Sequence, residues 1–301
     1  MKILVITGGT SSERKISLIS AKAVKKALEE NGHLVKLFDF KKGYPNLKKV
    51  IPDFDVIFPV IHGEEGEGGE LQKFLSKSKK PYVGGDWKGF KKGWYKIPFK
   101  KFCLENKITT SPWEKVTKKE DIIKFGFPCV LKSSTGGSSK EVSIIYSEKD
   151  FKKATIRKLL NSRLPLFVEK FITGVEVTVG ILDNKVLPVL EIIPPKGEWF
   201  DYKNKYSGTS QEIPNAPSLS LELQKLVQKI ALNIHKKLRL GHYSRIDFIV
   251  SNDIAYVLEV NTIPGMTVQS LLPKAAQTAG ISFPDLIKKL VEIAFKNNYE
   301  Y

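Results

Sequence analysis

A predicted β-hairpin near the end of the chain constrains the fold more than any other feature. Two runs rich in β-branched and aromatic residues, 244–250 and 254–260, are separated by the turn residues Ser-Asn-Asp at 251–253. Such runs on either side of a short polar turn are typical of a hairpin. We therefore expect two antiparallel strands here, with side chains that alternate between the two faces.

Four polar residues of this hairpin form a candidate site. By alternation, Arg245 shares a face with Asp247, and Glu259 shares a face with Asn261. If the two faces coincide, three oxygen ligands meet one guanidinium, and Mg2+ accepts such ligands when it also holds phosphate oxygens. The alternative is an ordinary surface hairpin in which Arg245 forms a salt bridge with Glu259 or Asp247. The residues alone leave both interpretations open.

Length and composition indicate an α/β protein of two or three domains. A chain of 301 residues with 42% hydrophobic residues can bury a substantial core. No run reaches the roughly 18 apolar residues of a membrane helix, so we expect no membrane partner. The apolar start, residues 1–9, ends too soon at a glycine turn for a signal peptide, and we interpret it as a buried first strand. Cys103 and Cys129 lie far apart in no metal or redox spacing, which favours a reducing cytoplasm.

The net charge of +17 raises the question of a polyanionic partner. Only five of the 49 basic residues are arginines, the side chain that suits bidentate phosphate and base contacts. The lysines are scattered over every segment. We therefore expect solvated helix faces and no specific nucleic-acid partner.

The first part of the chain alternates strands with helices, which predicts a parallel sheet with functional loops at the carboxyl ends of its strands. Gly8-Gly9 and His62-Gly63 lie at such ends. We assign this first domain to residues 1–85. Its expected elements are strands 3–7, 34–38 and 55–61 and helices 17–30 and 70–76.

Two further units are expected, at residues 86–172 and 173–301. The first should contain helices 94–106 and 149–160 and strands 128–132, 142–146 and 166–169. The second should contain a strand pair at 176–182 and 186–193, a polar loop at 194–217, helix 220–238, the hairpin, and a final helix at 284–296.

A Gly/Ser-rich loop follows the expected strand 128–132. It starts at Lys132 and continues as Ser-Ser-Thr-Gly-Gly-Ser-Ser over residues 133–139. Small residues let successive backbone N–H groups surround phosphate oxygens, and the lysine adds a point charge. The lysine precedes the glycines, so this is not a P-loop, and a flexible surface turn explains the pattern equally well.

The motifs Arg-x-Asp-Phe (245–248) and Glu-x-Asn-Thr-x-Pro-Gly-Met-Thr (259–267) resemble the C-terminal signature of the D-alanine–D-alanine ligases, members of the ATP-grasp superfamily. The resemblance continues in family order from residues 8–14 to 280–283 and covers nearly the whole chain. It implies a three-domain α/β ATP-grasp architecture, with an N-terminal parallel-sheet domain and then central and C-terminal ATP-grasp subdomains. It also implies that ATP drives the joining of two D-alanines for peptidoglycan precursors, in a homodimer.

The resemblance implies roles for five residues in catalysis. Glu13 would bind the ammonium of the first D-alanine and pair with Ser138 and Tyr206. A tyrosine at this loop position favours a dipeptide over an ester product. Arg245 and the N–H of Gly265 would stabilise the oxyanion. Without the resemblance, Glu13 would be interpreted as a carboxylate at a helix start.

Further roles follow from the same resemblance. His62 would face the first substrate, although a lone histidine after an apolar strand is more often structural. Residues that would bind the second substrate are Ser270 and Leu271, and those that would bind Mg2+ or Mn2+ are Asp247, Glu259 and Asn261. Residues that would bind ATP are Lys96, Lys132 and Lys205 at the phosphates, Glu169, Lys170, Phe171 and Ile172 at adenine, and Glu176 at the ribose.

The chain departs from the family pattern at four places. Tyr95 and Gly68 each stand where the family has an aspartate, Ser133 replaces a proline, and Lys140-Glu141 replaces Val-Gly in the ATP loop. A glycine position can demand backbone angles that glutamate disfavours. Two alternatives therefore stay open: a related ATP-grasp ligase with another second substrate, and a nucleotide-binding protein that no longer ligates.

Overall fold

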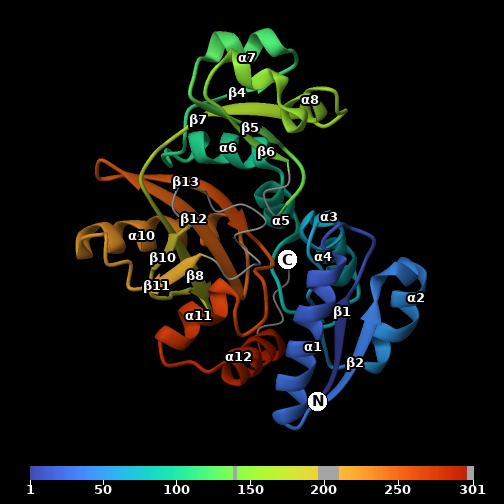
Figure 1. The fold of residues 1–301 in the computed structure, drawn as a ribbon. Helices are drawn as coiled ribbons and strands as arrows, with labels where there is room; N and C mark the ends of the chain where they lie inside the picture. The colour runs from blue at the N-terminus through green and yellow to red at the C-terminus, as the bar shows by residue number, and fades with distance from the viewer. Residues whose placement is uncertain (138–140, 196–209, 297–301) are drawn as a thin grey trace.

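The structure is a computed structural model that describes residues 1–137, 141–195 and 210–296. Helices and strands form a mixed α/β architecture around three β-sheets (Figure 1). None of the helices within these ranges is long and apolar enough to cross a membrane.

The first sheet is parallel, as predicted, with strand order β2-β1-β3. Its central strand, β1 (Lys2–Thr7), is fully buried from Ile3 onward, because a middle strand of a parallel sheet is covered on both faces. The other elements of this region are β2 (Leu34–Asp39), β3 (Val56–Pro59), α1 (Arg14–Glu30), α2 (Gly43–Val50), α3 (Glu64–Glu67) and α4 (Glu70–Lys77), with short 3-10 helices at Phe40–Lys42 and Ile51–Asp53.

The second sheet is antiparallel, with strand order β4-β7-β5-β6, and lies at the top of Figure 1. Its elements are β4 (Trp113–Val116), α7 (Lys119–Phe125), β5 (Cys129–Ser133), β6 (Val142–Ile145), η3 (Glu148–Lys152), α8 (Ala154–Leu160) and β7 (Leu166–Lys170). The prediction of one helix at 149–160 is wrong. Lys153 is extended and separates the 3-10 helix η3 from α8.

The third sheet is also antiparallel, with order β11-β10-β8-β12-β13 and β9 paired to β8. Its elements are β8 (Val175–Leu182), β9 (Lys185–Val186), β10 (Leu190–Ile193), β11 (Gln211–Pro214), α10 (Leu221–Lys237), β12 (Tyr243–Ser251) and β13 (Ile254–Asn261). The single strand expected at 186–193 is divided into β9 and β10. The loop expected at 194–217 contains β11, which the sequence analysis missed.

The hairpin prediction is confirmed. Strands β12 and β13 pair antiparallel, and Asn252 and Asp253 at the turn both have left-handed backbone angles, with φ of 47° and 61°. Two such residues in succession suit the right-handed twist of a tight hairpin. The register shifts by one residue after Asp247, as in a β-bulge.

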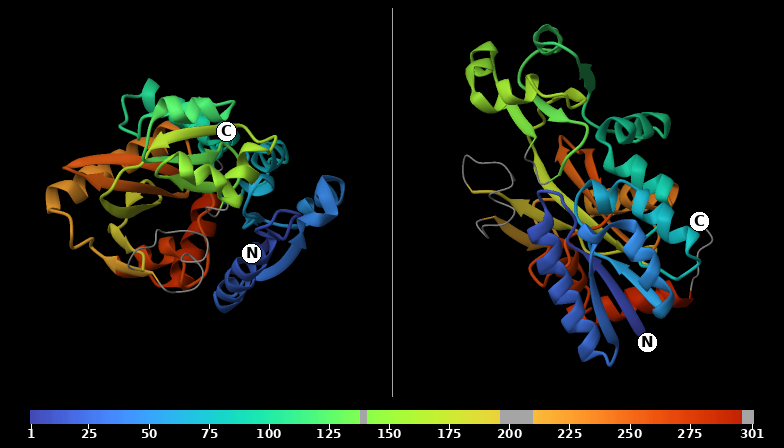
Figure 2. Two further views of the ribbon diagram at one scale, coloured as in Figure 1. Left: turned by 45° about the horizontal axis from the view of Figure 1, so that its top comes forward. Right: turned by 90° about the vertical axis from the view of Figure 1, so that its right-hand side faces the viewer.

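Two hydrophobic cores contain residues from more than one of the expected domains. Helices α11 (Leu271–Thr278) and α12 (Phe283–Lys296) share a core with α1, β1 and β3, and α12 contacts α1 directly (Figures 1 and 2). Helices α5 (Trp87–Trp94) and α6 (Lys96–Glu105) pack into the core of the third sheet. The domain boundaries at 85 and 172 therefore stay predictions.

Candidate active site

A cavity of about 710 Å3 is lined by residues from all three regions of the chain. Glu13 and His62 come from loops beside the parallel sheet, Lys132 from β5, and Asp247 and Glu259 from the hairpin. Its volume lies within the range of pockets that hold small ligands. Residues more than 200 positions apart in sequence thus share one chamber.

Asp247 is the most constrained side chain of the hairpin. Its Oδ1 accepts hydrogen bonds from Thr178 Oγ1 at 2.6 Å and Arg245 Nε at 2.9 Å. Its Oδ2 accepts bonds from Arg245 Nη2 and Asn261 Nδ2, both at 2.9 Å. Asp247 and Arg245 are buried, so the alternative of an exposed surface hairpin is wrong, although the Arg245–Asp247 salt bridge is present.

The three predicted metal ligands lie on one face of the hairpin. Asp247 stands opposite Glu259, Arg245 stands opposite Asn261, and all four line the cavity. Two carboxylates and one amide are hard oxygen donors of the kind that Mg2+ takes beside phosphate oxygens. No cluster of three His, Cys, Asp or Glu side chains that could hold a metal ion occurs within the described ranges. Protein donors occupy both oxygens of Asp247, so a metal ion would have to displace at least one of them.

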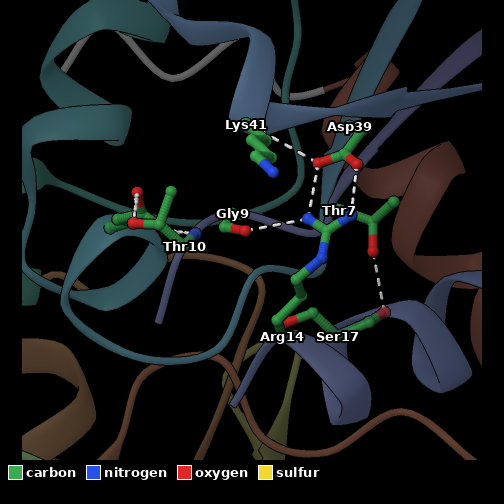
Figure 3. Close-up of polar contacts among 8 residues, drawn as sticks. Thr7, Gly9, Thr10, Arg14, Ser17, Asp39 and Lys41 are labelled. Carbon is green, nitrogen blue, oxygen red and sulfur yellow. Dashed lines mark hydrogen bonds and ion pairs between the residues drawn. The ribbon is translucent and has the colours of Figure 1, made fainter. Parts of the chain in front are cut away.

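Arg14 fixes the loop that leads into α1 (Figure 3). Its Nη1 donates to the Gly9 carbonyl and to Asp39 Oδ1, both at 2.8 Å, and its Nη2 pairs with Asp39 Oδ2 at 2.5 Å. This guanidinium holds the pKa of the Asp39 carboxyl well below its usual range. Thr7 Oγ1 also donates to the Ser17 carbonyl at 2.8 Å. These contacts tie the loop to the ends of β1 and β2.

The loop carries Glu13 into the cavity, where the side chain is buried. A Cβ atom added to Gly137 would lie 2.9 Å from Glu13 Oε2, so the Gly/Ser loop approaches this carboxylate closely. Ser138 and Tyr206, the predicted partners of Glu13, lie outside the described residues, as does Lys205. Their pairing with Glu13 stays a prediction.

His62 is buried against α1. Its Nε2 lies 3.2 Å from Ser20 Oγ, and its backbone N–H donates to Ser17 Oγ at 2.9 Å. Burial lowers the pKa of the imidazole, and the charge of Glu13 only partly opposes this. The imidazole lines the cavity, and hydrogen bonds to α1 hold it as they would hold a structural histidine.

Glu67 is a candidate residue that the sequence analysis missed. It lines the cavity at the end of α3, and its carboxylate accepts bonds from the N–H groups of Gly63 at 3.0 Å and Ile263 at 3.4 Å. Burial, reinforced by the charge of Glu13, raises its pKa to about 8. The sequence gives four glutamates within residues 64–70, and only the turn of α3 determines which of them points inward.

The predicted nucleotide residues line another part of the cavity. Lys96 Nζ donates to the Gly136 carbonyl at 2.8 Å, and Lys132 Nζ lies 2.5 Å from Glu169 Oε1. The ring of Phe171 packs edge-on against Tyr146, with centroids 6.0 Å apart. The remaining members of this group that line the cavity are Lys170, Ile172 and Glu176.

Gly265, Ser270 and Leu271 lie together at the start of α11. Ser270 Oγ accepts a bond from the Thr267 N–H at 3.1 Å, and a Cβ atom on Gly265 would lie only 2.9 Å from it. A larger residue at Gly265 would therefore displace Ser270. The ion pair of Lys274 with Glu212 also lines this side, and it was missed because Glu212 belongs to β11.

One of the departures from the family pattern, Tyr95, is compensated at α6. Tyr95 precedes this helix without capping it, and its hydroxyl instead donates to Glu64 Oε1 at 2.6 Å. Ser134 of the Gly/Ser loop takes over the cap, since its Oγ accepts from the Ile97 N–H at 3.1 Å and its carbonyl accepts from the Lys96 N–H at 2.9 Å. The Gly/Ser loop thus caps the N-terminus of α6 directly.

The other departures have local explanations. Ser133 donates its N–H to the Glu141 carbonyl at 3.1 Å, a bond that proline cannot make. The Glu141 carboxylate packs against Gly136, where an added Cβ would lie 2.4 Å from its Oε2. At Gly68 a Cβ would lie 2.6 Å from the Glu64 carbonyl, so α3 leaves no room for a side chain. Lys140 lies outside the described residues.

Comparisons with known proteins agree with these motifs. Residues 93–292 match the family description "D-ala D-ala ligase C-terminus". The D-alanine–D-alanine ligase of Maridesulfovibrio salexigens is 38% identical over 97% of this chain and 98% of its own length. That of Methylacidiphilum infernorum is 40% identical over 97% and 95%.

Among solved structures, the D-alanine–D-alanine ligase of Bacillus anthracis in complex with ATP superposes with a TM-score of 0.85, at 31% identity over 99% of this chain and 98% of that one. The expected α/β ATP-grasp architecture is therefore confirmed. Both the sequence relatives and this structure cover the chain almost from end to end. The chain belongs to the D-alanine–D-alanine ligase family.

Proposed function

We propose that this protein is an ATP-dependent ligase that joins two D-alanines into D-alanyl-D-alanine for peptidoglycan precursors. The observation that carries the proposal is the single cavity in which the expected nucleotide, substrate and metal residues meet. Relatives that bear this name span the whole chain, and the structure of one of them contains ATP.

The proposed reaction has two steps. The γ-phosphate of ATP passes to the carboxylate of the first D-alanine, which releases ADP and leaves an acylphosphate. The amine of the second D-alanine then attacks the acyl carbon, and phosphate leaves with the C–O bond electrons. Phosphoryl transfer depends mainly on positioning and charge neutralisation. Lys96 and Lys132 supply positive charge on the nucleotide side of the cavity.

A metal ion would add to that neutralisation. The hairpin offers Asp247, Glu259 and Asn261 as ligands, and Mg2+ or Mn2+ held there would neutralise charge on the phosphates. Arg245 is held by Asp247 through two bonds of 2.9 Å, so its guanidinium has a fixed direction. With the N–H of Gly265 it would stabilise the oxyanion of the second step.

The ammonium of the first D-alanine would be bound by Glu13. The Arg14–Asp39 pair holds the loop of this carboxylate in place, which limits the reorganisation needed when substrate arrives. Fixed geometry of this kind is a large part of what an enzyme contributes when two substrates must meet.

A coupled assay for ADP release with D-alanine tests the proposal. We expect D-alanine-dependent turnover by the intact protein and a loss of about 100-fold in Glu259→Gln, since the variant removes charge from the expected metal site with little change in shape. Glu105→Gln, at an exposed position of α6, is the matched control and should keep full activity.

The alternatives predict other outcomes in the same assay. A ligase with a different second substrate would release more phosphate with D-lactate or D-serine than with D-alanine alone. A nucleotide-binding protein without ligase activity would bind ATP and Mg2+ while no amino or hydroxy acid elicits phosphate release. Either outcome would contradict the proposal.

The proposal also includes the oligomeric state of the protein and its location in the cell. The expected homodimer is measurable as a mass of twice 33.9 kDa by light scattering. A cytoplasmic location is supported by the free, buried thiols of Cys103 and Cys129, which need no oxidising compartment.

A further inference from the structure

A buried cluster of three charges lies behind the nucleotide side of the cavity. Glu169 on β7 stands between two lysines: its Oε1 lies 2.5 Å from Lys132 Nζ on β5, and its Oε2 lies 2.5 Å from Lys100 Nζ on α6. The side chains are 3%, 17% and 1% exposed for Glu169, Lys132 and Lys100. The family motifs in the sequence imply roles for Glu169 and Lys132 and none for Lys100.

Lys100 lies behind the cavity wall and is not part of the surface that lines the cavity. Glu169 and Lys132 line the cavity, whereas Lys100 does not. Its Nζ also donates to Thr110 Oγ1 at 2.6 Å, and Thr110 in turn donates to the Val257 carbonyl at 2.8 Å. Lys100 is therefore held in place by α6, β7 and the segment beside β13, out of reach of a bound nucleotide.

The net charge of the cluster of Glu169, Lys132 and Lys100 indicates the role of Lys100. Two lysines and one glutamate leave one net positive charge at the cavity wall. Without Lys100, the carboxylate would be left with Lys132 alone, and that pair would be neutral. In a site shielded from water, such a change in net charge alters the binding of an anion strongly. The charge at Lys132 therefore depends on a residue that never meets the ligand.

We propose that Lys100 is a positioning residue that neutralises Glu169 and so leaves the charge of Lys132 available to the nucleotide phosphates. The inference rests on the proposed function, in which ATP occupies this cavity. It adds that Lys100, which lies outside the cavity, affects how strongly the phosphates are bound, because Lys100 and Lys132 share the carboxylate of Glu169.

The ionisation of the cluster supports this assignment. Burial alone would raise the pKa of Glu169, but Lys100 and then Lys132 lower it to about 2. The carboxylate is therefore charged at every pH at which the enzyme would work. Burial lowers the pKa of Lys100, and the adjacent charge of Glu169 opposes that shift. A charged carboxylate buried this deeply needs a counterion, and Lys100 is the partner that ligand binding does not disturb.

The test compares ADP with adenosine, which share the base and ribose and differ in phosphate. Both are titrated into the full-length protein in the presence of Mg2+ by calorimetry, and the ratio of their affinities isolates the phosphate contribution. In Lys100→Met we expect this ratio to fall about tenfold, which corresponds to about 1.4 kcal/mol. Lys101→Met, at the exposed neighbouring position of α6, is the matched control and should keep the ratio of the unaltered protein.

A double variant separates charge from structure. Lys100→Met with Glu169→Gln removes both charges and frees Lys132 again, so the ratio should return to within about twofold of its original value. Any contact of Glu169 with the base affects ADP and adenosine alike and cancels in the ratio. If Lys100→Met alone does not fold, as thermal unfolding would show, Lys100→Gln takes its place in both comparisons, because it removes the charge and keeps a polar group beside Thr110 and Glu169.

Equal losses of ADP and adenosine affinity in Lys100→Met would overturn the inference, because they would indicate a merely structural lysine. A double variant that keeps the tenfold deficit would also overturn it. Failure of the proposed function looks different: the unaltered protein would show no D-alanine-dependent release of ADP, whatever the two affinities. Only an unaltered protein that does not bind ADP at all would remove both claims.

Discussion

Glu67 shows how the position of one side chain determines its protonation. Its pKa of about 8 in the folded protein is well above the ordinary carboxyl value of 4.5, because burial and Glu13 disfavour its charged form. The folded state therefore holds this proton more tightly than the unfolded chain. The stability that it contributes is present in full below about pH 4.5 and is lost as the pH rises through about 8.

Glu67→Gln should remove this dependence. Between pH 6.5 and 8 the unaltered protein should lose stability by up to about 1.4 kcal/mol per pH unit from this group, and the variant should lose less. Urea unfolding at several pH values measures the slope, with Glu114→Gln at an exposed position of β4 as control. An equal slope in the variant and the unaltered protein would show that Glu67 is already ionised.

The direction of a single side chain was predictable where the alternation of side chains along a strand determined it. Alternation paired Arg245 with Asp247 on one strand and Glu259 with Asn261 on the other, and left open whether the two pairs share a face. The register of the hairpin brings them together. Glu67 and Lys100 follow no such rule, since each is buried by elements that are distant in sequence. Their burial could not be read from the chain alone.

At the scale of elements, the N-terminus of α6 couples helix stability to the nucleotide site. Ser134→Ala removes the acceptor for the Ile97 N–H and should destabilise the protein by about 1 kcal/mol. Ser220→Ala at the N-cap of α10 removes the equivalent bond to Leu223 and should have a similar effect. Only Ser134→Ala should also weaken ADP binding, because Lys96 begins the helix that Ser134 caps. Equal ADP affinity in the two variants would contradict this coupling.

Element prediction succeeded for strongly patterned segments and failed where tertiary contacts decide. The buried strand β1 and the long helices α1 and α10 have clear patterns in the sequence. Strand β11 is short and polar, and it exists because it pairs with β10 across the loop expected at 194–217. The helix expected at 149–160 is divided because Ser147 and Asp150 cap a separate 3-10 turn. Neither result follows from periodicity.

At the scale of the whole molecule, buried histidines with lowered pKa values reduce the stability of the fold at low pH. His235 bonds with Ser244 and the Gly241 carbonyl, and His242 accepts from the Gly84 N–H at 3.0 Å, where the first region meets the third sheet. Burial lowers the pKa of both imidazoles from 6.5 to about 4. Their stabilising effect is present above pH 6.5 and is lost as the pH falls toward 4, because the unfolded chain takes up protons that the folded state does not.

The two opposing dependences predict a stability maximum near pH 6.5. Below that value His235 and His242 outweigh Glu67, and the buried His62, whose pKa burial also lowers, adds to their effect. Above it Glu67 acts without them. Denaturant unfolding at pH 5, 6.5 and 8 should give the highest midpoint at 6.5, with a net loss of at least about 1.4 kcal/mol per pH unit on the acid side. A protein more stable at pH 5 than at 6.5 would show that these imidazoles are protonated in the folded state.

The packing of α12 against α1 has a consequence for biosynthesis. The apolar faces of β1 and α1 leave the ribosome more than 250 residues before Leu286, Ile287 and Leu290, which complete their core. We expect nascent chains that stop before α11 to remain open to protease at the amino end, even though every strand of the first sheet has already emerged. Translation must therefore pass α12 before β1 and α1 can complete their packing.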